Sequence, residues 1–221
     1  MSGDGTNDEL FELLARVGKA LGNGTRLRLI ELLAQGPRGV IELAEAAGLN
    51  LTTASAHLQT LKRAGLVATS RSGTTIRYRL ADTDVMALFG QLRHVAATHL
   101  ADFETVARRH LGPDDTEHIG REELLHRASA GDVVVLDVRP PHEYAVGHIP
   151  GAISIPLDEL PARLDELPTD TDIVAYCRSS YCVFSHDAVR ILTAAGRRAV
   201  RLSDGVLEWR QSGQPLLASA A

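Results

Sequence analysis

The stretch LTTASAHLQTLKRAGLV, residues 51–67, decides the fold of the first half of the chain. Its apolar residues recur at the spacing of one helix face, which turns Ala54, Leu58 and Leu61 inward. Gly65 then ends the pattern, because glycine accepts the left-handed backbone that closes many helices. The stretch therefore predicts a short amphipathic helix with one polar side facing outward.

The segments around this helix predict a compact DNA-binding unit. The expected elements are helices over residues 7–21, 25–34, 41–47 and 51–64, followed by strands over 66–70 and 75–80. Gly48-Leu49-Asn50 joins the last two helices, and Gly73 allows a tight turn between the strands. Two short helices followed by a hairpin are a winged helix-turn-helix, whose second helix enters the major groove of DNA.

The polar side of the helix over 51–64 carries residues suited to DNA. Gln59 can bond an adenine edge with both ends of its amide, while Lys62 and Arg63 can hold phosphates. No acidic residue occurs between Glu45 and Asp82, which favours a surface facing phosphate, although chance also produces such gaps. The predicted DNA-binding residues are Thr52, Thr53, Ser55, His57, Gln59, Lys62, Arg63, Arg71 and Arg77. His57 has a second interpretation, in which it only supports the turn.

Residues 8–110 resemble repressors of the ArsR type, because helix, turn, wing and flanking helices occur in that order. The resemblance implies a homodimer that binds double-stranded operator DNA of palindromic sequence. A final helix over 83–110 offers an apolar stripe for the dimer contact: Phe89, Leu92, Ala96, Leu100, Phe103 and Val106. Packing against the second half of the chain is the alternative use of this stripe.

Three histidines on the last helix raise the question of metal sensing, which ArsR-type proteins often perform there. His94, His99 and His110 are five and eleven residues apart, whereas ligands on one helix face are three or four apart. The first half of the chain also contains no cysteine. We therefore predict no metal site and no cofactor.

The length of 221 residues suits two domains, and Gly112-Pro113 marks the division. We predict a DNA-binding and dimerisation domain over 1–110, a linker over 111–118 and a second domain over 119–221. The formal charge is +2 over residues 1–110 and −7 over the remainder. No long apolar run and no secretion signal are recognisable, so we expect a cytoplasmic protein without membrane contact.

Strands and helices alternate in the second half of the chain. The expected strands cover residues 133–138, 152–155, 173–177 and 199–202, and the expected helices cover 120–130, 157–164 and 183–195. This alternation predicts an α/β domain with a mainly parallel sheet covered on both faces. Ligands of such sheets gather beyond the carboxyl ends of the strands, which is where Cys177 lies.

The loop Cys177-Arg-Ser-Ser-Tyr-Cys182 joins a buried strand to the next helix. A tight loop that opens a helix points several backbone N–H groups at one centre, where they stabilise an anion. The predicted cradle consists of Ser179, Ser180, Tyr181 and Val183. The cradle lowers the pKa of the Cys177 thiol and Arg178 adds positive charge, so Cys177 is the predicted nucleophile.

Sequence on both sides of this loop resembles rhodanese domains over about residues 118–217. The stretch VLDVRPPHEYAVGHIPGAISIP, residues 135–156, is similar to their first motif, and residues 205–209 and 213–215 to their last. The resemblance implies that Cys177 attacks a sulfane sulfur donor, becomes a persulfide and passes the sulfur to a thiol acceptor. It also places four residues near the site, where we expect internal pairing rather than chemistry: Asp137, Arg139, Glu143 and His148.

Two departures within the loop narrow the chemistry. Related phosphatases have arginine six positions after the cysteine, whereas here Val183 stands there, so phosphoryl transfer is not expected. Cys182 replaces the cation that rhodanese loops often carry, which argues against efficient use of thiosulfate. A second thiol can attack the Cys177 persulfide and leave a disulfide, or Cys182 is only a small buried anchor for the helix.

Together the two halves predict a DNA-binding transcriptional repressor whose Cys177 persulfide senses or transfers sulfane sulfur. Three alternatives stay open. The protein is a sulfurtransferase whose helical half only dimerises, or a regulator whose second domain binds a ligand without turnover. In the third, Cys177 and Cys182 bind arsenite.

Overall fold

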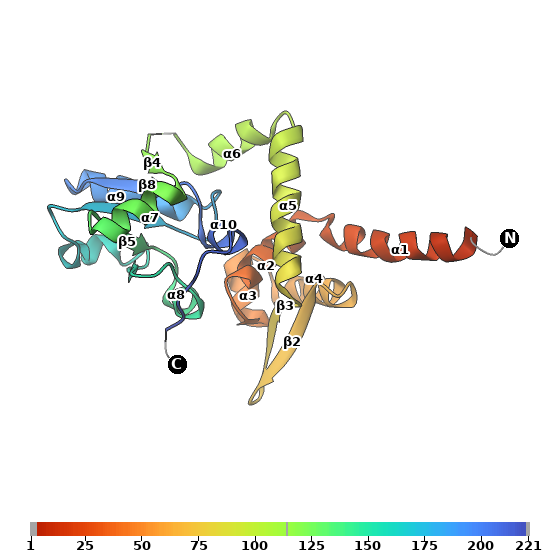
Figure 1. Ribbon diagram of the computed structural model, residues 1–221. Helices are drawn as coiled ribbons and strands as arrows, with labels where there is room; N and C mark the ends of the chain where they lie inside the picture. The colour runs from red at the N-terminus through yellow and green to blue at the C-terminus, as the bar shows by residue number, and fades with distance from the viewer. Residues whose placement is uncertain (1–3, 114, 220–221) are drawn as a thin grey trace. The chain divides into compact units, whose positions relative to one another are not determined.

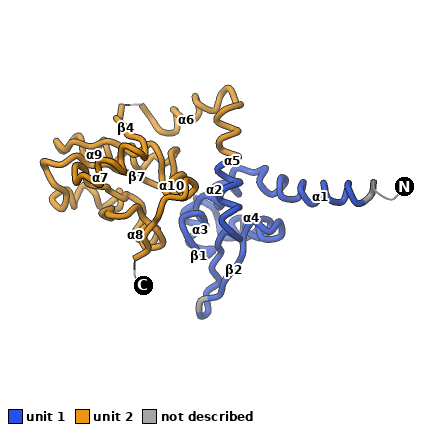
Figure 2. Tube along the Cα trace, in the orientation of Figure 1, with its two compact units in different colours: residues 1–91 blue, residues 92–221 orange. Residues whose placement is uncertain are grey.

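The structure, a computed structural model, describes residues 4–113 and 115–219 of the chain. The chain divides into two compact units, of which the first ends at Gln91 and the second begins at Leu92 (Figure 2). The helix α5 (Thr83–His99) crosses this division. The linker predicted over 111–118 therefore lies inside the second unit, because the end of α5 and the helix after it belong to that unit.

The first unit is a winged helix-turn-helix, as predicted (Figure 1). Its elements before α5 are α1 (Asp4–Leu21), α2 (Gly24–Ala34), β1 (Arg38–Gly39), α3 (Val40–Ala47), α4 (Leu51–Arg63), β2 (Val67–Ser72) and β3 (Thr75–Leu80). Ala54, Leu58 and Leu61 of α4 are fully buried, as the helical spacing predicted. The core also contains Leu29 of α2 and Leu43 of α3, and both of these helices pack against α4.

Local capping explains where α4 begins. Gly48 closes α3 with φ +64°, a left-handed conformation that glycine adopts without steric cost. The Asn50 side chain then accepts a hydrogen bond from the backbone N–H of Thr53 at 2.8 Å. This contact satisfies one of the free N–H groups at the helix start. The turn between the two helices is therefore specified by three consecutive residues of the sequence.

The wing is longer than the sequence predicted. Strands β2 and β3 pair antiparallel from Val67 opposite Leu80 to Ser72 opposite Thr75. Only Gly73 and Thr74 remain for the turn, and Gly73 has φ +61°. The two-residue strand β1 extends the sheet to the order β1-β3-β2, and it was not predicted because two residues carry no periodic pattern.

The single helix predicted over 83–110 is wrong. Residues 100–102 separate α5 from α6 (Phe103–Leu111), so the expected apolar stripe is not continuous. Phe89 is buried in the first unit, whereas Phe103 contacts the ring of Tyr181 in the second unit. Leu100 and Val106 remain more than half exposed. The break turns Phe103 toward a tertiary partner that helical spacing cannot reveal.

The second unit is an α/β domain with a parallel sheet, as predicted. Its strands are β4 (His118–Ile119), β5 (Val133–Asp137), β6 (Ile153–Ser154), β7 (Asp172–Tyr176) and β8 (Ala199–Leu202). They are ordered β4-β8-β7-β5-β6, and all neighbouring pairs are parallel. The central strand β7 and its neighbour β5 are almost entirely buried, which explains why their sequences are apolar on both faces.

Two apolar layers cover the sheet. The helices of this part are α7 (Arg121–Ala130), α8 (Pro141–Val146), α9 (Val183–Ala194) and α10 (Val206–Gln211). Tyr176 of β7 packs in one layer with Trp209 of α10. Ala175, the preceding residue of β7, packs in the opposite layer with Leu192 of α9. Successive strand side chains thus alternate between the layers.

In the second unit one predicted helix is wrong and three short elements were not predicted. The helix expected over 157–164 is wrong, because this region holds only the 3-10 turns Leu160–Ala162 and Leu164–Glu166. Pro161 lacks the N–H that a longer α-helix would use. The helices α8 and α10 and the strand β4 were not predicted, since each spans six residues or fewer.

None of the helices in residues 4–113 and 115–219 has the length and hydropathy required to span a membrane.

Candidate functional site

The two cysteines of the chain lie at the carboxyl end of β7 and are bonded to each other. Residues 177–182 connect β7 to α9, and their ends are close enough for a disulfide, with the two Cα atoms 6.2 Å apart. Cys177 is 1% exposed, whereas Cys182 is half-buried. In this structure the six-residue loop brings the two sulfur atoms together as a disulfide, so the Cys177 thiolate stays a prediction for the reduced form of the loop.

The backbone amides of the loop are also partly committed. The N–H of Cys182 donates to the Ser179 carbonyl at 3.0 Å, and the N–H of Ser180 donates to Oε1 of Glu208 at 3.3 Å. The predicted cradle consists of Ser179, Ser180, Tyr181 and Val183. One of its N–H groups, that of Ser180, is therefore already bonded to the Glu208 carboxylate of α10. The sequence showed no signal for this contact, since Glu208 lies 28 residues from Ser180.

The loop rests on α10 through its main chain. The N–H groups of Val206 and Leu207 donate to the carbonyls of Cys177 and Arg178, each at 3.0 Å. A Cβ atom at Gly205 would overlap the backbone of Arg178 and Ser179. Only glycine allows this approach, which gives a physical reason for the glycine in the motif over 205–209.

Arg178 points to a carboxylate and not to the sulfur atoms. Its Nε lies 2.9 Å and 3.0 Å from the two carboxylate oxygens of Glu143, and its Nη2 lies 2.6 Å from Oε1. The Glu143 side chain is completely buried. The positive charge predicted for Cys177 is thus balanced by Glu143, because the two side chains form a bidentate pair. This agrees with the internal pairing expected of Glu143.

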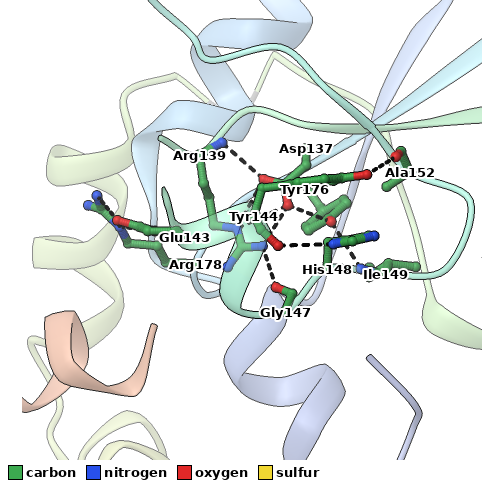
Figure 3. A network of polar contacts seen from close by, with 10 residues as sticks. All are labelled: Asp137, Arg139, Glu143, Tyr144, Gly147, His148, Ile149, Ala152, Tyr176 and Arg178. Carbon is green, nitrogen blue, oxygen red and sulfur yellow. Dashed lines mark hydrogen bonds and ion pairs between the residues drawn. The ribbon is translucent and has the colours of Figure 1, made fainter. Parts of the chain in front are cut away.

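A second buried pair lies behind the loop (Figure 3). The Asp137 carboxylate accepts hydrogen bonds from Nε and Nη2 of Arg139 at 3.0 Å and 2.6 Å, and both side chains are inaccessible to solvent. Arg139 also donates to the Gly147 carbonyl at 2.8 Å. The hydroxyl of Tyr176 donates to Asp137 at 2.6 Å and accepts from the N–H of Ile149 at 3.1 Å. The network fixes the end of β7, directly before Cys177.

Burial changes the ionisation of Tyr176 in this network. Removal from water raises the pKa of Tyr176 well above its usual value, and the neighbouring Asp137 charge acts in the same direction. His148 stacks on Tyr144 with ring centres 3.7 Å apart, and its Nδ1 lies 2.9 Å from the Tyr144 carbonyl. Neither tyrosine was predicted as a site residue from the sequence, although Tyr176 lies at the end of a buried strand.

The predicted DNA-binding face is a surface of α4 and the wing. Thr52, Gln59, Lys62 and Arg63 are exposed, while Thr53, Ser55 and His57 are half-buried. The Gln59 amide donates to the Tyr78 hydroxyl at 3.1 Å, and Lys62 donates to the Thr69 hydroxyl at 2.9 Å. These contacts hold side chains of α4 against the wing.

The two arginines predicted on the wing differ in their surroundings. Arg71 is exposed and donates only locally, to the Gly73 carbonyl at 3.1 Å. Arg77 donates to the Pro37 carbonyl at 3.1 Å and lies 3.7 Å from Glu42. The stretch without acidic residues is thus not free of acidic neighbours in space, because Glu42 of α3 reaches Arg77.

Comparison with known proteins agrees with this architecture. Residues 23–69 match the family model described as bacterial regulatory protein, arsR family, and residues 120–212 match the rhodanese-like domain. The chain is 56% identical to the HTH-type transcriptional regulator Rv0324 of Mycobacterium tuberculosis, over 94% of this chain and 91% of that protein. This chain belongs to the arsR family and carries a rhodanese-like domain. It is accordingly a DNA-binding regulator.

Each half of this arsR-family regulator also has separate relatives. The second half is 38% identical to a sulfurtransferase of Allochromatium vinosum, over 45% of this chain and 94% of that protein. The first half is 51% identical to a fragment of Mb0332 from Mycobacterium bovis, over 45% of this chain and 91% of that fragment, with a TM-score of 0.43. That fragment is described as a homodimeric winged helix-turn-helix DNA-binding domain of a possible ArsR-family regulator.

Proposed function

We propose that this arsR-family regulator senses sulfane sulfur at Cys177 and that Cys182 completes the reaction. The observation that carries the proposal is the placement of both sulfur atoms in one six-residue loop, within bonding distance, at the carboxyl end of β7. Sulfur atoms so placed exchange with each other and with outside thiols. The sequence similarity of this half to a sulfurtransferase supports the same chemistry.

The cycle starts by opening the disulfide. A thiolate reductant attacks the sulfur of Cys182, which is the more exposed of the two residues, and Cys177 leaves as a thiolate. A second reductant thiol then attacks the mixed disulfide, which releases the oxidised reductant and frees Cys182 as a thiol. The reduced loop thus holds Cys177 at the buried end and Cys182 nearer to solvent.

Sulfur transfer follows on the reduced loop. The Cys177 thiolate attacks the outer sulfur of a donor such as glutathione persulfide, and the glutathione thiolate leaves. The Cys182 thiol then attacks the inner sulfur of the Cys177 persulfide, which re-forms the disulfide and releases the outer sulfur with the proton as hydrosulfide. In this cycle the Cys177–Cys182 disulfide is therefore the state that follows reaction with one sulfane sulfur atom.

DNA binding requires a second copy of the chain in this proposal. Leu10, Phe11, Leu13 and Leu14 of α1 are each more than half exposed, a concentration of apolar side chains unusual for a free helix. Leu92 and Val95 of α5 are also exposed. We propose that these faces meet their equivalents in a homodimer, which would bind two operator half-sites.

The test combines a gel shift with mass spectrometry. The reduced full-length protein selects its own duplex from a random DNA library, and binding is then measured before and after addition of glutathione persulfide. We expect the donor to weaken binding of the wild type and not of Cys177→Ser, while Cys182→Ser accumulates one extra sulfur on Cys177. Equal release of DNA from wild type and Cys177→Ser would refute the proposal.

Arsenite binding by Cys177 and Cys182 is the second candidate, because two thiols close enough to form a disulfide are close enough to share one arsenic atom. This candidate predicts that arsenite releases DNA from the reduced protein without any sulfur donor. It also predicts that either single serine variant abolishes the effect. Release by the persulfide donor alone would favour sulfur sensing.

A further inference from the structure

The loop between the two cysteines is held by a residue of α5. Within the second unit, Nη2 of Arg93 donates to the Ser180 hydroxyl at 2.9 Å and to Oε1 of Glu208 at 2.7 Å. Its guanidinium also lies over the Tyr181 ring, 4.9 Å from the ring centre. Arg93 lies 87 residues from Ser180 in the sequence, so no local motif predicts this contact.

The Arg93 guanidinium balances the negative charge of Glu208, a carboxylate that also contacts the loop. The same oxygen that pairs with Arg93 also accepts hydrogen bonds from the N–H and the hydroxyl of Ser180, at 3.3 Å and 3.1 Å. Its other oxygen accepts from the N–H of Gly205 at 2.9 Å. The side chains of Arg93 and Glu208 are 16% and 21% exposed, so water screens this pair only weakly.

A second contact comes from α6. The rings of Phe103 and Tyr181 form a T-shaped pair, with ring centres 5.4 Å apart and an angle of 79° between the ring planes. Tyr181 is therefore enclosed by Arg93 on α5 and Phe103 on α6, and it is the residue directly before Cys182. Edge-to-face pairs and cation–π contacts both stabilise the position of an aromatic ring. Both helices thus restrain the segment that must move when the cysteines change their bonding.

We propose that Arg93 is a positioning residue of the sulfur site, which ties the Cys177–Cys182 loop to α5 and balances the Glu208 charge beside it. The sulfur chemistry in this statement rests on the proposed function, whereas the effect of Arg93 on the loop does not. The same helix carries Val85, Met86 and Phe89, which are buried in the first unit, and Arg93, which contacts the loop in the second unit.

The charges around the loop predict the direction of the effect. Arg178 of the loop is paired with Glu143 of α8, and Arg93 of α5 is paired with Glu208 of α10. The loop also holds two further ionisable side chains, Tyr181 and Cys182, of which Cys182 is bonded to Cys177 in this structure. Removing the Arg93 charge leaves the Glu208 carboxylate uncompensated next to Ser180. A nearby negative charge disfavours a thiolate, so Cys177 becomes less reactive at neutral pH.

The experiment measures alkylation of reduced, full-length protein with iodoacetamide as a function of pH, and mass spectrometry follows the Cys177 peptide. We expect Arg93→Gln to slow the modification of Cys177 near pH 7 by about threefold to tenfold and to shift the profile to higher pH. Arg93→Lys keeps the charge and should recover most of the rate. Arg93→Gln with Glu208→Gln removes both charges and should also restore it.

The matched control is Arg108→Gln, because Arg108 of α6 is exposed and its ion pair is with Glu104, within the same helix. This variant should leave the pH profile unchanged. Fluorescence of Trp209, the only tryptophan, shows whether each variant keeps the second unit folded. If Arg93→Gln is folded and its profile equals that of the wild type, the proposal is wrong. A general loosening of the loop would also overturn it, since the doubly neutral variant would then stay slow.

Coupling to DNA supplies a second readout. If α5 links the loop to the DNA-binding core, the selected duplex should shift the pH profile of Cys177 alkylation in the wild type and less so in Arg93→Gln, because proton binding and DNA binding at coupled sites affect each other equally. An equal change in both proteins would overturn the role of Arg93 in this link. A wild type that ignores sulfur donors but shows the Arg93-dependent pH profile would refute the proposed function alone.

Discussion

Removing the carboxylate of Asp137 tests whether the buried network behind the sulfur loop holds the second unit together. In the native structure this carboxylate accepts from the backbone N–H and the guanidinium of Arg139 and from the hydroxyl of Tyr176. Asp137→Ala leaves the Arg139 charge buried and opposite a neutral methyl group. The Gly147 carbonyl at 2.8 Å still accepts one guanidinium N–H, but it carries no balancing charge.

The expected cost follows from the complete burial of both side chains. Breaking a buried pair by deleting one partner typically costs about 3–5 kcal/mol, since the remaining charge keeps its desolvation penalty. The lost hydrogen bond from Tyr176 adds about 1 kcal/mol. For a unit of this size, 1 kcal/mol corresponds to roughly 3–5 °C, so the melting temperature should fall by roughly 10 °C or more.

Trp209 makes the assay specific to the second unit. This residue is 1% exposed in the same apolar layer as Tyr176, so its fluorescence reports unfolding of that layer. Urea denaturation of wild type and Asp137→Ala, followed at the tryptophan emission, gives the difference in free energy of unfolding. The control is Asp158→Ala, which removes an exposed carboxylate of the same unit and should change stability by less than about 0.5 kcal/mol. A loss below about 1 kcal/mol for Asp137→Ala would refute this account of the network.

Three further predictions concern other parts of the molecule. Lys62→Ala should weaken DNA binding at every sequence and lower the slope of log affinity against log salt by about one, as measured by fluorescence anisotropy; an unchanged slope would remove Lys62 from the interface. Leu14→Glu should shift sedimentation equilibrium toward monomer, because it places a charge in the proposed α1 contact. The pKa of Tyr176 is raised in the folded protein. The contribution of Tyr176 to stability is therefore complete below about pH 10, and it is lost as the pH rises through the pKa that Tyr176 has in the folded state. Tyr176→Phe should therefore show a smaller alkaline loss of stability than the wild type, and an equal loss would contradict the assignment.

Local patterns were sufficient for most of the architecture. The apolar spacing over 51–64 predicted α4 and its buried residues, because a helix facing a core must repeat its apolar side chains every three or four residues. The continuous apolar runs of β5 and β7 predicted buried parallel strands for a similar reason. The six-residue helices α8 and α10 were not predicted, since they hold fewer than two helical turns, and neither were the two-residue strands β1 and β4.

The amino-acid order alone was enough to place Cys177 after a buried strand and Cys182 in the same loop, and so to identify where chemistry is possible. The residues that contact this loop are determined by the tertiary structure. Glu208 occupies one of its amides, Glu143 neutralises Arg178, and Arg93 and Phe103 enclose Tyr181. Each of these contacts joins residues at least 28 positions apart. Charge and packing at such separations depend on which surfaces meet in space, whereas periodicity and turn chemistry describe only neighbours along the chain.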